Sequence, residues 1–153
     1  MAAVTWTGGE EHWTTRPTSD GDVRLFMWRK PSRAKSALRG TILFVHGSSM
    51  ASQPTFDLSV PGRPDSSVME WFAERGFDTW CLDNEGYGRS DKKRNINFNI
   101  PNGADDLAAA SQYICDKTGA KKLLVYGISS GALKAALLPH PSTAAASAAQ
   151  NSP

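Results

Sequence analysis

Residues 127–131, Gly-Ile-Ser-Ser-Gly, constrain the fold of this 153-residue chain more than any other segment. They follow the apolar run 122–126, Lys-Leu-Leu-Val-Tyr, and precede the helix-forming stretch 132–138. A strand that turns directly into a helix reverses so tightly that a side chain on either flank would clash, so both glycines are steric requirements. The sequence therefore predicts a strand, a sharp turn and a helix, with Ser129 exposed at the apex.

Upstream of this turn, the sequence predicts an antiparallel hairpin and a buried strand. Residues 11–15 and 23–28 are the expected hairpin strands, and they flank the turn sequence 19–22, Ser-Asp-Gly-Asp. The unbroken apolar run 41–45 is typical of a strand buried on both faces of a parallel sheet. This strand leads into the dipeptide His46-Gly47.

Helices and strands alternate along the rest of the chain. The apolar spacing predicts a helix over 66–75, a strand over 77–82 and a helix over 105–117 that Gly119 closes. Such alternation predicts an α/β fold with a doubly wound, mostly parallel sheet behind the N-terminal hairpin. Sites in sheets of this kind lie at the carboxyl ends of the strands. His46-Gly47, the loop 83–91 and Ser129 are all expected at that edge.

The residues at this edge suit nucleophilic chemistry on an acyl group. A serine hydroxyl needs a base to become a strong nucleophile, and the oxyanion that develops needs two preorganised N–H donors. We expect these donors to be the backbone N–H groups of Ser130 and Ser48. Gly47 would allow that backbone to approach the substrate.

Taken together, these motifs resemble the α/β-hydrolase superfamily over residues 8–138. The resemblance rests on the hairpin, the strand that ends at His46-Gly47, the loop 83–91 and the turn 127–131, in that order. It implies that Ser129 is a nucleophile and that Ser48 and Ser130 form the oxyanion hole. It also implies a small-molecule ester or related acyl substrate, with no cofactor and no metal. None of these motifs selects a particular substrate.

The acid and the base of such a site have no clear counterpart in the sequence. In the family they follow the nucleophile, yet no Asp or Glu follows Gly131, and His140 is the only later histidine. A continued helix would place His140 ~16 Å from the Ser129 hydroxyl, far beyond hydrogen-bond reach. His46 is expected to form structural hydrogen bonds, and Asp83 to fix its own loop. We therefore expect an α/β-hydrolase fold truncated after the turn, with little activity by itself.

The C-terminal segment differs from the rest of the chain. Residues 139–153 contain no Lys, Arg, Asp or Glu and no large apolar side chain, so we expect a low-complexity, disordered tail after a partial domain over 8–138. This composition suggests the out-of-frame or prematurely ended translation of a longer hydrolase. The outer edge of strand 122–126 would then be unpaired, which favours self-association.

Composition excludes several other classes of protein. With 40% hydrophobic residues, the chain has enough apolar residues for one core. Its net charge of +2 gives no strong positive electrostatic field that would attract nucleic acid. No window reaches the ~18 apolar residues of a membrane span, so the sequence indicates no membrane partner and a cytoplasmic protein. Cys81 and Cys115 match neither a disulfide framework nor a metal site and are expected to be buried, reduced thiols.

Two alternatives to an active hydrolase remain open at this point. Gly86-Tyr87-Gly88 follows a strand, with Asp105-Asp106 about twenty residues further on, which is reminiscent of a nucleotide-binding module. Asp91 stands where the third glycine of that motif belongs, and no helix opens directly at the turn. The other alternative is a non-catalytic remnant of the hydrolase fold with a binding role.

Overall fold

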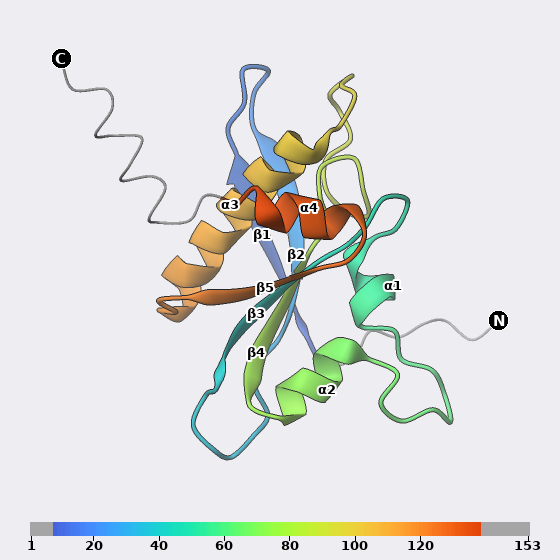
Figure 1. Ribbon diagram of the computed structural model, residues 1–153, viewed down its shortest axis with the longest axis vertical. Coiled ribbons are helices and arrows are strands. Elements are labelled where there is room, and N and C mark those ends of the chain that lie inside the picture. Colours follow the sequence, from blue (N-terminus) through green and yellow to red (C-terminus); the bar gives the residue numbers. More distant parts are fainter. Residues whose placement is uncertain (1–7, 139–153) are drawn as a thin grey trace.

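The computed structural model describes residues 8–138, which form a five-stranded sheet flanked by helices (Figure 1). The strands are β1 (Glu10–Arg16), β2 (Val23–Lys30), β3 (Gly40–Val45), β4 (Phe77–Leu82) and β5 (Leu123–Gly127). Their spatial order is β1-β2-β4-β3-β5. The pairs β1–β2 and β2–β4 are antiparallel, whereas β4, β3 and β5 are parallel. This mixed sheet confirms the fold class predicted from the sequence.

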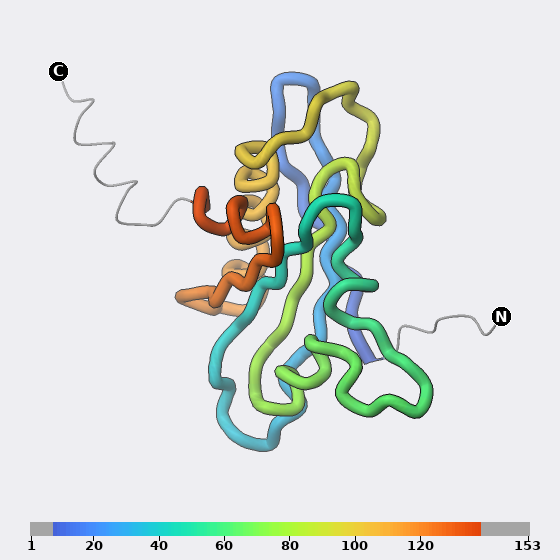
Figure 2. Tube along the Cα trace, turned by 45° about the vertical axis from the view of Figure 1, so that its right-hand side comes forward, coloured from blue at the N-terminus to red at the C-terminus, as the bar shows by residue number. Residues whose placement is uncertain are grey.

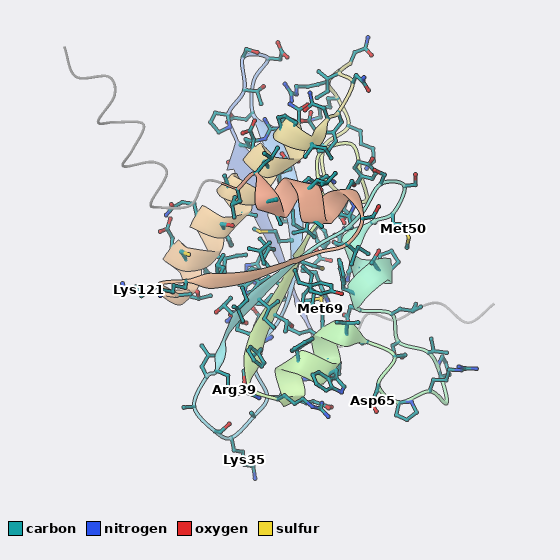
Figure 3. All side chains as sticks on the ribbon, in the orientation of Figure 1. Lys35, Arg39, Met50, Asp65, Met69 and Lys121 are labelled. Carbon is teal, nitrogen blue, oxygen red and sulfur yellow. The ribbon has the colours of Figure 1, made fainter. Side chains whose placement is uncertain are left out.

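Helices cover both faces of the sheet, as the tube view also shows (Figure 2). On one face lie α3 (Ile100–Thr118) and α4 (Ser130–Ala136), and on the other α1 (Ser52–Phe56) and α2 (Val68–Glu74). Each face has its own apolar core. Leu107, Ala110 and Ile114 of α3 pack on the first face. Phe56 of α1 and Met69 of α2 pack on the second, where Figure 3 shows Met69 on the side of α2 that faces the sheet.

The N-terminal hairpin forms as predicted. Thr18 and Gly21 exchange two backbone hydrogen bonds of 3.2 Å, and the φ of Gly21 is 104°. A positive φ of this size favours glycine because a Cβ would clash with the backbone. The turn sets the register from Arg16 opposite Val23 to Glu10 opposite Arg29.

The interior strand β3 is buried on both faces, again as predicted. Every residue from Thr41 to Val45 is buried between β4 on one side and β5 on the other. Phe44 faces the aromatic core beneath α1 and α2, and Leu43 faces the core beneath α3. Burial on both faces is why the strand is an unbroken apolar run rather than an alternating one.

Helix α3 begins at Ile100, five residues before the predicted start at Asp105. The earlier start is set by Asn99, whose side chain accepts the Asn102 N–H while the Asn102 side chain accepts the Asn99 N–H. This reciprocal cap satisfies N–H groups that the first turn leaves without a partner. The predicted end is correct, since Gly119 caps the helix with a φ of 73°.

Some local features were not predicted from the sequence. The loop after β3 contains the short helix α1, which has no apolar repeat. Trp71 is 39% exposed because it lies on the outer side of α2, where the Arg75 guanidinium covers its ring at 3.7 Å from the centroid. Cys115 is only half-buried, whereas Cys81 is buried as expected, and both are free thiols.

Strand β5 lies at one edge of the sheet in the described part of the chain, where it pairs with β3 alone. Leu124 and Tyr126 are 57% and 55% exposed on this strand. The predicted tail over 139–153, with His140, lies outside the described residues. Within residues 8–138, no helix is long and apolar enough to cross a membrane.

Candidate active site

The site is built where the parallel strands β3 and β5 end side by side. Val45 pairs with Gly127 in the last step of the register, and the Ile128 N–H donates to the Val45 carbonyl at 3.1 Å. The segment after each strand therefore leaves the sheet at the same point. This placement brings residues 46–48 against residues 128–130.

Ser129 occupies the sharp turn between β5 and α4. Its φ of 51° and ψ of −127° are rare for any residue other than glycine, and α4 begins at the next residue, Ser130. Ser129 is exposed. Backbone strain of this kind persists only where the surrounding structure enforces it, and it concentrates at functional sites. The predicted strand, turn and helix around Ser129 are all present.

The glycines around the turn are required by close packing. A Cβ on Gly127 would overlap the backbone of Gly131. A Cβ on Gly131 would lie 2.8 Å from the carbonyl oxygen of His46, and one on Gly47 would lie 2.9 Å from the Ser129 Cβ. The turn and the loop after β3 are thus packed against each other through positions that lack side chains.

Ser48 and Ser130, the predicted oxyanion donors, lie next to each other. Their Oγ atoms are 3.0 Å apart, within hydrogen-bond distance. Within residues 8–138, neither backbone N–H donates a hydrogen bond to another residue. Two free N–H groups beside an exposed serine are the arrangement that an oxyanion hole requires.

His46 is buried below the site and is held at both ring nitrogens. Its Nε2 accepts the Asn84 backbone N–H at 3.0 Å, so Nδ1 carries the proton and donates to the Gly47 carbonyl at 2.6 Å. Burial lowers the pKa of His46 below its ordinary value of 6.5, and the nearby Lys134 also lowers it. A neutral imidazole with both nitrogens bonded to backbone has no free position from which to accept a serine proton.

Asp83 is likewise committed to its own loop. Its Oδ1 accepts the Ser52 N–H at 2.7 Å and the Ser52 hydroxyl at 2.6 Å, and its Oδ2 accepts the Arg89 N–H at 2.9 Å. The carboxylate therefore joins the loop after β4 to the start of α1. This is the loop-fixing role that the sequence favoured over a catalytic one.

Sequence reasoning missed a buried polar network centred on Asn84. Its side-chain oxygen accepts from Lys134 Nζ at 2.9 Å, and its side-chain nitrogen donates to Asp106 at 3.3 Å. Asp106 also accepts from Arg16 Nε at 2.7 Å. Lys134 lies four residues after Ser130 on the same face of α4, a spacing that could have indicated it. Asn84 carries no such signal, because its partners come from other elements.

The geometry of the loop after β4 does not suit a dinucleotide. Gly88 packs so closely on Asp83 that a Cβ at position 88 would overlap the Asp83 carboxylate. The loop therefore closes around the Asp83 side chain. Asp106, one of the two acids placed for a ribose, is buried and paired with Arg16. Across residues 8–138, no group of three or more His, Cys, Asp or Glu side chains is arranged to hold a metal ion.

Comparison with known proteins places this geometry in a known family. A family model described as serine aminopeptidase, S33, matches residues 36–149. An esterase from Pyrococcus furiosus is 22% identical, with a TM-score of 0.58 over 82% of this chain and 44% of that one. An α/β hydrolase from a Penicillium species is 20% identical, with a TM-score of 0.56 over 80% and 38%. A haloalkane dehalogenase variant from Bradyrhizobium elkanii is 19% identical, with a TM-score of 0.57 over 84% and 35%.

At these identities the likeness shows the fold, which is that of the α/β hydrolases. The chain spans less than half the length of each of these solved structures. A search of curated proteins gave no match.

Proposed function

Because the chain belongs to the family described as serine aminopeptidase, S33, we propose that it carries the nucleophile and the oxyanion hole of a serine hydrolase. Ser129 is the nucleophile, and the backbone N–H groups of Ser48 and Ser130 stabilise the oxyanion. The substrate is a small molecule with an ester or related acyl bond.

The backbone conformation of Ser129, with φ 51° and ψ −127° between β5 and α4, is the observation that carries this proposal. Such a turn lifts the side chain away from the strand and towards solvent. The next residue, Ser130, supplies one of the two donors through its backbone N–H. The free N–H of Ser48, brought close by the packing of Gly47 on Ser129, supplies the second donor.

In the proposed reaction, Ser129 Oγ bonds to the carbonyl carbon as its proton leaves. The carbonyl electron pair moves to oxygen, where the two N–H groups donate to the resulting oxyanion. The intermediate then collapses, the bond from carbon to the leaving-group oxygen breaks, and an acyl-serine remains. A water molecule then attacks the same carbon and loses a proton, the bond from that carbon to Ser129 Oγ breaks, and the serine oxygen regains a proton as the acid leaves.

Proton removal limits this reaction in the chain by itself. Within residues 8–138, His12 and His46 are the histidines. The His12 ring forms hydrogen bonds with Tyr113 and Glu10, and the His46 ring forms hydrogen bonds with backbone groups. No described histidine is therefore placed to take the Ser129 proton. We propose that this chain acylates slowly and turns over poorly, since loss of a triad base costs several powers of ten in rate.

Hydrolysis of p-nitrophenyl acetate tests both parts of the proposal. We expect slow release of nitrophenolate that stops near a single equivalent per chain and is lost in Ser129→Ala. Sustained turnover at ordinary enzyme rates of roughly 1–10³ per second would contradict the proposed inactivity. Release that continues unchanged in Ser129→Ala would contradict the nucleophile.

A non-catalytic hydrolase fold with a binding role is the second candidate. The engagement of both described histidines in structural hydrogen bonds is the observation that favours it. In that case folded protein would show no release that depends on Ser129.

A further inference from the structure

Lys134 is a buried cation beside the candidate active site. It lies on α4 and is only 2% exposed. Its aliphatic stem passes directly over Gly103 of α3, where a Cβ would lie 2.6 Å from Lys134 Cδ. The absence of a side chain at Gly103 thus gives the lysine its path into the interior.

The charge of Lys134 has no carboxylate partner in the described part of the chain. Its Nζ donates to the neutral Asn84 side chain, and no ion pair involves it within residues 8–138. Asp106 is the acid whose charge acts on it, but both carboxylate oxygens of Asp106 already accept hydrogen bonds, from Arg16, Asn84 and the Glu85 N–H. An ammonium has three donors, so Lys134 keeps donors without a partner. A buried charge in this position is costly unless something pairs with it.

A cavity of about 230 Å³ lies next to this ammonium. It is lined by Ser48, Tyr87, Phe98, Asn99, Ile100, Ser130 and Lys134. Lys134 is the only charged residue of this lining, so the cavity is electropositive. Lys134 Nζ lies 5.7 Å from the centroid of the Tyr87 ring and 5.5 Å from that of Phe98, and such aromatic faces favour a cation.

The cavity is continuous with the site of the proposed acyl chemistry. Ser48 and Ser130 line it and also carry the proposed oxyanion donors. A carbonyl oxygen that accepts from the Ser48 and Ser130 N–H groups would therefore lie at the edge of this cavity, with space beside it for the acyl chain. At about 230 Å³ the cavity is smaller than the roughly 300–1,000 Å³ of pockets for drug-sized ligands, so only a short chain fits.

We infer that this cavity binds a short acyl chain that ends in a carboxylate, which pairs with Lys134. This inference rests on the proposed function and names its substrate class, the half-esters of short dicarboxylic acids. Hydrolysis would break the ester bond between the acyl carbon and the alkoxy oxygen. Water supplies the new oxygen on the acyl carbon, and the products are an alcohol, a dicarboxylate and a proton.

The test is a binding measurement that needs no catalysis. Monomethyl glutarate carries the carboxylate, and dimethyl glutarate is its neutral counterpart. In the Ser129→Ala protein, titration calorimetry should show at least about tenfold tighter binding of the monomethyl ester, the scale of a hydrogen bond to a charged group. Lys134→Met in the same background should abolish this preference. Lys117→Met, which removes an exposed lysine from α3, should retain it.

Absence of the preference in Ser129→Ala, or its survival in Lys134→Met, would overturn the inference. If Lys134→Met does not fold, amide chemical shifts of the Ser129→Ala protein serve instead. Monomethyl glutarate should shift the Ser48, Ser130 and Lys134 signals, and shifts elsewhere alone would overturn the inference. Because these proteins lack Ser129, the binding result does not depend on whether Ser129 is the nucleophile. A negative binding result likewise leaves the assignment of Ser129 as nucleophile unaffected.

Discussion

Gly47 lies so close to Ser129 that a methyl group built on its Cα would come within 2.9 Å of the Ser129 Cβ. The contact joins the loop after β3 to the turn after β5 at a point where no extra atom fits. It also brings Ser48, the residue after Gly47, within hydrogen-bond distance of Ser130. The two halves of the proposed site are thus held together by this packing and by the hydrogen bond between the Ser48 and Ser130 hydroxyls.

Gly47→Ala should therefore weaken both the fold and the site. The added methyl must push the two segments apart, and overpacking of this kind costs about 1–3 kcal/mol in the free energy of unfolding. Urea denaturation measures this loss. An unchanged free energy of unfolding in Gly47→Ala would show that the loop after β3 shifts at no energetic cost.

The strain at Ser129 predicts an unusual order of stability among its variants. Glycine adopts a φ of 51° readily, whereas alanine keeps the strain of serine. Relief of about 1–3 kcal/mol of strain outweighs the 0.4–1 kcal/mol by which glycine favours the unfolded chain. Ser129→Gly should thus unfold at higher urea concentration than Ser129→Ala. The reverse order would mean that the turn is not strained.

His46 should make the protein sensitive to acid. Burial lowers its pKa in the folded state below the ordinary 6.5, so below that pH the unfolded chain binds a proton that the folded chain does not. The stability that the neutral ring contributes is fully present above 6.5 and falls as the pH drops towards the lower, folded-state pKa. Protonation of His46 at Nε2 would also remove the acceptor of the hydrogen bond from the Asn84 backbone N–H.

Urea denaturation between about pH 7 and pH 5 checks this dependence. His46→Gln removes the titrating ring, so the free energy of unfolding should fall less steeply with acid in this variant than in the native chain. Parallel slopes for the two proteins would show that His46 does not contribute to the pH dependence.

The edge of β5 that has no partner strand within residues 8–138 should drive self-association. Leu124 and Tyr126 expose apolar surface beside unpaired backbone groups, and we expect the β5 edges of two copies to pair. Sedimentation velocity over a concentration series should show this association. Leu124→Lys should weaken it by about tenfold, or roughly 1.4 kcal/mol. Leu38→Lys is the control, since Leu38 is also 57% exposed but precedes β3. An equal effect of both variants would place the contact elsewhere.

The sequence predicted those parts of the structure that depend on near neighbours in the chain. The strands, the turn at Gly21 and the cap at Gly119 follow from local patterns of apolar residues and glycine. The start of α3 was missed because its signal, the reciprocal cap of Asn99 and Asn102, lies in a polar stretch without an apolar repeat. Helix α1 is too short to have a repeat at all.

In the candidate site, too, the sequence predicted only the residues that are close neighbours in the chain. Ser129 and its glycines were found because the turn is encoded within five consecutive residues. The network of Asn84, Asp106 and Lys134 was not found, because it joins the loop after β4 to the helices α3 and α4. Such contacts exist only once the sheet order brings these elements together.

Labelling with a fluorophosphonate tests the central claim, that Ser129 is a nucleophile, most directly. Intact-mass and peptide mass spectrometry of the folded chain should show a single adduct on Ser129, absent after unfolding in urea and absent in Ser129→Ala. Labelling of Ser48 or Ser130 in place of Ser129, or no labelling of the folded protein, would contradict the account.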